Sequence, residues 1–210
     1  MFAKPMSAKT DAKSLIKFLD NEIWHLRCVY ATYAHLYGSD SDTRKLMSDS
    51  DAAFFSDLYI VYLHYISVGV SRLLDPEETL GKPNLTIFKL IATLKSDGHP
   101  EVEKLHQRLS DIKKRAYNFT DPRKQLVAHL DYKAHCIEPD TRPIPSFTKD
   151  EFEEFYKDTG QLMNDIRAII GMPPFLYNLG IVGGHSCGRK LLHRLKTASD
   201  HIASKASTKY

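Results

Sequence analysis

The spacing of apolar residues along the chain predicts long helices and almost no strands. From about position 12 to 37, apolar and aromatic side chains recur every three or four residues, and Gly38 follows as a stop. A second apolar run, from about 52 to 74, is too long for a strand and ends at Asp75-Pro76, where proline disfavours a continuing helix. Both patterns are typical of amphipathic or buried helices.

The rest of the chain predicts shorter helices joined by polar connectors. We expect helices over about 85–94 with Asn84 as N-cap, about 100–119, about 121–135 and about 186–203. Another should begin after Thr148, whose spacing to Glu151 matches a capping box, and end at Gly171 before two prolines. The stretches 39–51, 76–84 and 136–148 are expected to be non-helical connectors.

These elements predict an all-α fold, a helical bundle with long antiparallel helices and an additional C-terminal helix. A chain of 210 residues suits one domain. We assign residues 12–203 to that domain, 1–11 to a flexible N-terminus and 204–210 to a polar tail.

The composition of the chain indicates the cellular compartment of the protein more clearly than it indicates its chemistry. The formal net charge of +3 is compatible with an anionic partner such as RNA but does not require one. Cys28, Cys136 and Cys187 form no CxxC pair, which is typical of a reducing compartment. The N-terminus has no apolar signal region, and the apolar stretch 58–70 is short and interrupted by His64. These features predict a cytoplasmic protein without a membrane partner.

The segment DPRKQLVAHLD, residues 121–131, carries the strongest candidate chemistry. With Asp121 as cap and Pro122 in the first turn, Arg123 would lie where backbone N–H groups favour a phosphate. His129 has an ordinary pKa of about 6.5, which suits proton transfer near neutral pH. Six positions separate them by about 120° around an ideal helix, so a shared groove needs the long arginine or a second copy. On spacing alone, a surface arginine and a partly buried histidine are the commoner explanation.

A family resemblance changes this balance. RKQLVAHLD resembles the motif of the HEPN superfamily, in which a histidine follows an arginine after four to six residues. Residues 71–91, SRLLDPEETLGKPNLTIFKLI, and the ending Ala128-His129-Leu130-Asp131 resemble the AbiU-like abortive-infection branch. The resemblance covers about residues 12–200, although only these two segments are specific.

The resemblance implies a helical bundle that dimerises and cleaves RNA without a metal ion. It makes Arg123 and His129 the catalytic pair, with Lys124, Asp131 and Arg72 as candidate substrate-binding residues. The expected products carry 2′,3′-cyclic phosphate and 5′-hydroxyl ends. A second copy of the chain, RNA and an antitoxin protein are the implied partners, within a phage-defence or toxin–antitoxin system.

Other interpretations remain open at this point. Active members usually have Asn, Asp or His after the arginine, whereas Lys124 cannot accept a proton when charged. This favours a non-catalytic helical module that binds RNA or protein; a dimerisation domain without a nucleic-acid role is a third reading. Arg72 either pairs with Asp75 or approaches Arg123.

Two further groups of residues have simpler explanations. Tyr59, Tyr62 and Tyr65 could stack on bases but more simply pack a helix interface. The ten histidines form no HExxH motif, and no metal or cofactor is expected.

Overall fold

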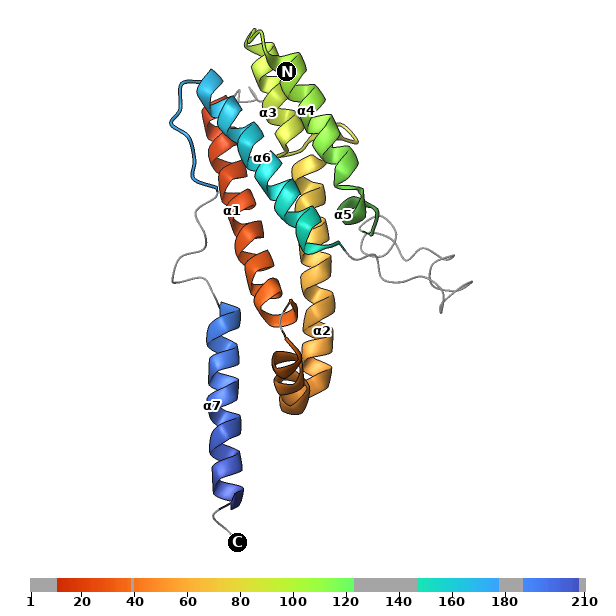
Figure 1. Cartoon of the computed structure of the whole chain (residues 1–210). Coiled ribbons are helices and arrows are strands. Elements are labelled where there is room, and N and C mark those ends of the chain that lie inside the picture. Colours follow the sequence, from red (N-terminus) through yellow and green to blue (C-terminus); the bar gives the residue numbers. More distant parts are fainter. Residues whose placement is uncertain (1–10, 39, 123–146, 178–186, 208–210) are drawn as a thin grey trace, which may run out of the picture.

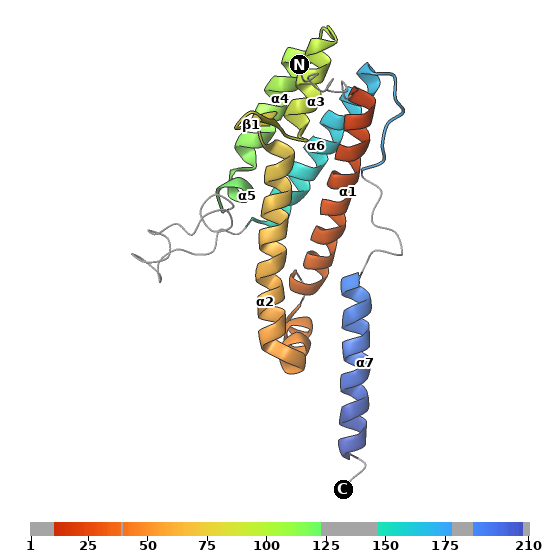
Figure 2. The same ribbon diagram turned by 180° about the vertical axis from the view of Figure 1, so that it is seen from behind.

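The chain folds as an all-α bundle, as its apolar spacing predicts (Figure 1). The computed structural model describes residues 11–38, 40–122, 147–177 and 187–207. Helices α1 (Ala12–Tyr37) and α2 (Ser41–Leu74) are the two longest, and Figures 1 and 2 show them side by side. Asp11 caps α1 by accepting a hydrogen bond from the backbone N–H of Ser14.

Helix α2 begins earlier than the sequence predicts, and the predicted connector over 39–51 is wrong. Asp40 caps a helical stretch that starts at Ser41, and Met47 buries its side chain beside Leu36 and Phe55. The structure instead has a kink in α2 near position 52, where the sequence predicts the helix to start. Asp51 leaves the helical region, with φ −169° and ψ 93°, and its side chain caps the second part of α2 by accepting from the N–H of Phe54 at 3.0 Å.

The predicted connector after α2 contains a small hairpin of β1 (Glu78–Thr79) and β2 (Lys82–Pro83). Helix α3 (Ile87–Ser96) follows, with Thr86 as its N-cap. The prediction of Asn84 as cap is therefore wrong. The Asn84 side chain instead closes the hairpin, donating to the carbonyl oxygen of Pro76 at 2.9 Å and to Thr79 Oγ1 at 2.7 Å.

The predicted helix over 100–119 is divided. Helix α4 (Val102–Arg115) stops at Ala116, and the short helix α5 (Tyr117–Pro122) begins directly after it. The buried ring of Phe119 anchors α5 to the core. Asp121 and Pro122 belong to this helix, which begins at Tyr117, so the predicted helix start at Asp121 is wrong. The predicted place of Arg123 in a first helical turn depends on that start, and Arg123 itself lies outside the described residues.

Helix α6 (Lys149–Ile169) has the predicted capping box, with Thr148 and Glu151 each accepting from the other's backbone N–H. Gly171, with φ +68°, follows its end as predicted. Helix α7 (Cys187–Ser207) extends beyond the predicted end near 203. It lies beside the C-terminal end of α1 and the N-terminal part of α2 and projects past them (Figures 1 and 2).

Two groups of buried side chains hold the bundle together. The main core joins α1, the second part of α2, α3, α4 and α6. A smaller cluster of Leu36, Met47 and Phe55 is covered by Leu192 and Leu195 of α7. Gly188 permits this contact, because a Cβ there would lie 3.0 Å from the carbonyl oxygen of Thr32.

Among the described helices, α2 alone is long and apolar enough to cross a membrane. Core helices of soluble proteins meet the same criterion, so the cytoplasmic location stays a prediction.

The hairpin turn gives a direct test of backbone strain. Leu80 and Gly81 both have positive φ, 51° and 75°, as a two-residue turn of type I′ requires. Leu80 is 97% exposed, so it gains nothing from burial. Asparagine tolerates this conformation, and we expect Leu80→Asn to raise the free energy of unfolding by about 1 kcal/mol in urea titrations.

Gly81→Ala is the matched control for this prediction. It adds a Cβ in the same turn, where nothing lies within 4 Å, and should lower the free energy of unfolding by a similar amount. No change in either variant would show that left-handed strain at this turn does not affect the bundle.

Candidate functional site

The residues expected to carry catalysis cannot be located in the fold. Arg123, Lys124, His129 and Asp131 all lie outside the described residues. Arg72 is described. It lies near the end of α2, exposed, with its Nη2 3.5 Å from Glu22 Oε2 of α1. This partner was not foreseen, and the approach of Arg72 to Arg123 stays a prediction.

The two points where the candidate segment 123–146 joins the bundle lie against each other. Phe119 of α5 and Phe147, just before α6, are buried and stacked with ring centroids 4.6 Å apart. Asn118 Nδ2 donates to Glu151 Oε1 at 2.5 Å and adds a polar link beside this stack. The residues on either side of this segment in the sequence therefore contact each other.

A cluster of tyrosines borders this junction. The Phe147 ring lies 6.0 Å from that of Tyr33, which in turn lies 5.9 Å from Tyr59 and 6.3 Å from Tyr62. Packing between α1 and α2 is thus confirmed for Tyr59 and Tyr62. Tyr65 differs, because it is 43% exposed and meets the His25 ring edge-on at 5.8 Å.

These tyrosines are hydrogen-bonding groups rather than bases. Burial raises the pKa of Tyr30 to about 12 and that of Tyr37 to about 12, and it also raises the pKa of Tyr33. Their hydroxyls stay protonated near neutral pH, and that of Tyr37 donates to the carbonyl oxygen of Phe55 at 2.8 Å. These hydroxyls are therefore not proton acceptors near neutral pH.

Arginines near the junction are already neutralised. Arg27 Nη1 lies 2.6 Å from Glu153 Oε1. Arg115 pairs with both Glu154 and Asp158 of α6. The start of α6 is therefore an acidic surface whose charges are matched by arginines, and it offers little free positive charge to a phosphate.

Unmatched positive charge is found on α7. Arg189, Lys190, Arg194 and Lys196 are exposed, and within the described part of the chain no acidic side chain forms an ion pair with any of them. The charge of Arg189 adds to burial in lowering the pKa of His35 on α1. This helix can attract phosphate groups, and the sequence analysis did not single it out.

A hollow of about 420 Å³ lies between α3, α4 and the residues Pro76 and Glu77 that follow α2. Phe88 and Ile91 contribute apolar surface, Lys113 Nζ lies 5.2 Å from the Phe88 ring centroid, and His106 meets that ring edge-on at 5.5 Å. Its shape and apolar lining suit a small amphipathic molecule. As for metals, no cluster of three or more ligating side chains occurs among the residues that the structure describes.

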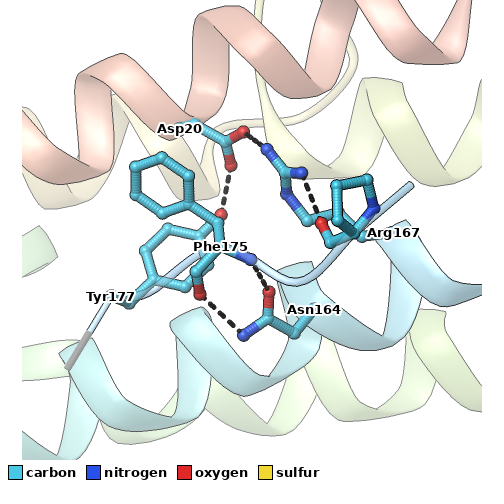
Figure 3. A network of polar contacts seen from close by, with 6 residues as sticks. Asp20, Asn164, Arg167, Phe175 and Tyr177 are labelled. Carbon is cyan, nitrogen blue, oxygen red and sulfur yellow. Dashed lines mark hydrogen bonds and ion pairs between the residues drawn. The ribbon is translucent and has the colours of Figure 1, made fainter. Parts of the chain in front are cut away.

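A buried polar network joins α1, α6 and the chain after α6 (Figure 3). The Asp20 carboxylate accepts hydrogen bonds from Arg167 and from the Tyr177 hydroxyl. Arg167 also donates to the carbonyl oxygen of Pro173 at 2.8 Å. Gly160 leaves room for the Tyr177 side chain, since a Cβ there would lie 3.0 Å from Tyr177 Cβ and 3.1 Å from the ring atom Cγ.

This network is built for stability rather than for chemistry. Asp20, Arg167 and Tyr177 are at most 6% exposed, and burial, followed by the Asp20 hydrogen bond, raises the pKa of Tyr177. Asn164 adds two hydrogen bonds to the backbone of Phe175, at 2.8 and 3.0 Å. Together they fasten the segment 172–177 to the bundle.

Comparison with protein-family models, with curated proteins and with solved structures finds no match for this chain.

The buried pair predicts a large difference between two acidic residues of α1. Asp20→Ala would leave the Arg167 guanidinium buried without a counter-charge and should lower the free energy of unfolding by about 3–5 kcal/mol. Urea unfolding followed by circular dichroism measures the loss.

Glu22→Ala is the matched control, because Glu22 is exposed and its contact with Arg72 spans 3.5 Å. Its cost should stay below about 1 kcal/mol. Equal effects of the two substitutions would contradict a special role for the buried pair.

Proposed function

We propose that the chain is a metal-independent endoribonuclease of a phage-defence or toxin–antitoxin system, built as a HEPN-type helical bundle. The observation that carries this proposal is the spacing of Arg123 and His129 in a chain with an all-α fold. Helix α5 includes Pro122, directly before Arg123, and the residues that flank the segment 123–146 in the sequence meet in the Phe119–Phe147 stack. This arrangement supports a catalytic segment carried on a rigid frame.

In the proposed mechanism, the Arg123 guanidinium binds the scissile phosphate and stabilises the charge that develops on it. His129 of one copy removes the proton from the ribose 2′-hydroxyl, whose oxygen attacks phosphorus. The bond from phosphorus to the 5′-oxygen breaks, and His129 of a second copy protonates that oxygen. The products are a 2′,3′-cyclic phosphate and a 5′-hydroxyl.

Other residues would bind the substrate rather than react with it. Lys124, Asp131 and Arg72 are the proposed contacts near the catalytic pair. The exposed side chains of Arg189, Lys190 and Arg194 on α7 support RNA as the substrate, because they can bind phosphates that the matched arginines of the junction cannot. The protonated tyrosines leave proton transfer to His129.

The ribonuclease proposal predicts which histidine matters. Purified wild type should cleave a mixed RNA in EDTA and leave cyclic phosphate ends, whereas His129→Ala should lose at least about 100-fold in rate. His135→Ala is the matched control within the same segment and should cleave like wild type. Cleavage that disappears in EDTA and returns with a metal ion would overturn the mechanism.

Lys124 favours a second function, a non-catalytic helical module that binds RNA or a protein such as an antitoxin. This module would leave RNA intact yet bind it with a steep salt dependence, and Arg123→Ala would reduce the slope by about one phosphate contact. Filter binding at several salt concentrations measures that slope. Binding without cleavage by wild type, together with cleavage by Lys124→Asn, would identify Lys124 as the residue that suppresses activity.

A further inference from the structure

The hollow between α3 and α4 has a buried apolar lining and exposed residues at its rim. Ile91 and Val102 line it from the core side, where both are buried, and Phe88 and Ala92 are half-buried. Figure 1 shows α3 and α4 side by side, and Gly98, with φ +79°, lies in the turn between them. Ala92 has only a methyl group to fill the space. The volume of about 420 Å³ falls within the range of roughly 300–1,000 Å³ that small-molecule sites occupy.

Two polar side chains of α4 meet the Phe88 ring at one end of the hollow. Lys113 Nζ lies 5.2 Å from the ring centroid, and the His106 ring meets the Phe88 ring edge-on at 5.5 Å. His106 and Lys113 are seven positions apart and therefore lie on the same face of α4. The cation–π contact holds the Lys113 ammonium at the wall of the hollow, where a bound molecule can reach it.

The acidic and basic side chains that line the hollow are only partly matched. Lys95 Nζ lies 2.9 Å from Glu103 Oε1, so these two charges balance each other. Lys113 and Glu77 line the same hollow from different elements, α4 and the chain after α2, and neither forms an ion pair with a described residue. The described lining therefore offers one cation, one anion and an apolar surface to a bound molecule.

We propose that the hollow between α3 and α4 binds a small zwitterion with an apolar side chain, such as an apolar amino acid. The carboxylate of the ligand pairs with the Lys113 ammonium, and the His106 ring offers an N–H to the same carboxylate. The ammonium of the ligand pairs with the Glu77 carboxylate. Its side chain packs on the apolar lining and displaces water from it.

A zwitterion fits the charges of the lining better than a ligand with one charge. A ligand with only a carboxylate would face the Glu77 carboxylate without compensation, and a ligand with only an ammonium would face Lys113. A free amino acid and a short peptide share the required chemistry and differ in the distance between their end groups. The inference uses none of the residues proposed to act on RNA.

Ligand titrations of the ¹⁵N-labelled chain, followed by amide chemical shifts, test the site directly. L-Phenylalanine, with about 12 non-hydrogen atoms, should bind with a dissociation constant of roughly 0.1–1 mM. 3-Phenylpropionate and 2-phenylethylamine keep the ring but lack one charge each, and both should bind about tenfold more weakly. If phenylalanylphenylalanine binds more tightly than phenylalanine, the source is a peptide; the opposite order indicates a free amino acid. No binding of either zwitterion at about 10 mM would overturn the proposal.

Two charge-removing variants assign the two ends of the ligand. Lys113→Met should weaken phenylalanine and 3-phenylpropionate about tenfold without weakening 2-phenylethylamine. Glu77→Gln should weaken phenylalanine and 2-phenylethylamine without weakening 3-phenylpropionate. Lys114→Met and Glu78→Gln are the matched controls, because these residues do not line the hollow, and they should bind all three ligands like wild type. Circular dichroism confirms that each variant is folded. Equal effects of Lys113→Met and Glu77→Gln on all three ligands would contradict the assigned contacts.

Filling the hollow tests the place of binding. Ala92→Leu adds three carbon atoms within the lining and keeps a strong helix former, so it should weaken phenylalanine by at least about tenfold. Ala53→Leu makes the same change at an exposed position of α2 outside the hollow and should bind like wild type. Undiminished binding by Ala92→Leu would place the ligand elsewhere and overturn the proposal. Because none of these measurements involves RNA, this site and the ribonuclease activity can fail independently.

Discussion

The buried ion pair between Asp20 and Arg167 is the contact on which the arrangement of the bundle depends. Two opposite charges inside a core are tolerated only when each meets the other, so this pair sets how α1 and α6 lie together. Tyr177 and the Pro173 carbonyl attach the chain after α6 to the same point. With α6 held in this way, Phe152 stacks on Tyr30, their ring centroids 3.6 Å apart, and Phe147 reaches Phe119. The contact between Phe119 and Phe147, the residues that flank the candidate segment, therefore depends on a polar contact elsewhere in the core.

The charges of the molecule are divided between two kinds of surface. At the start of α6, acids and arginines neutralise each other and hold α1, α4 and α6 together. On α7, Arg189, Lys190 and Arg194 are exposed and form no ion pair with an acidic side chain of the described residues. Near the junction a polyanion would gain little, because the acids and arginines there cancel each other's charge. Along α7 the exposed basic side chains would attract it. The net charge of +3 conceals this division.

Much of the helical architecture could be read from apolar spacing, and the errors have identifiable causes. The capping box at Thr148 and Glu151 was predictable because both residues act within one turn. The apolar spacing does not predict the helical stretch 41–50, because Met47 is its single buried residue and most of the others are polar. Asn84 was taken for a cap because side-chain partners across a hairpin leave no local pattern. Asp20 falls on the apolar face of α1, a signal of a buried charge that the sequence alone could not match to its partner 147 positions away. The catalytic pair stays a prediction.

The kink at Asp51 has a consequence for how the sequence of this protein can change. Because the backbone leaves the helical region there and Asp51 caps the next turn, the second part of α2 starts its own rotational phase. Inserting or deleting a residue before Asp51 need not turn the face that carries Val61 and Tyr65. The same change after Asp51 would rotate the residues that follow it by about 100° relative to those before it, so that the buried side chains of this part, such as Phe55 and Ile66, would no longer all face the bundle. Length variation among homologous chains should therefore be tolerated on one side of this residue and selected against on the other.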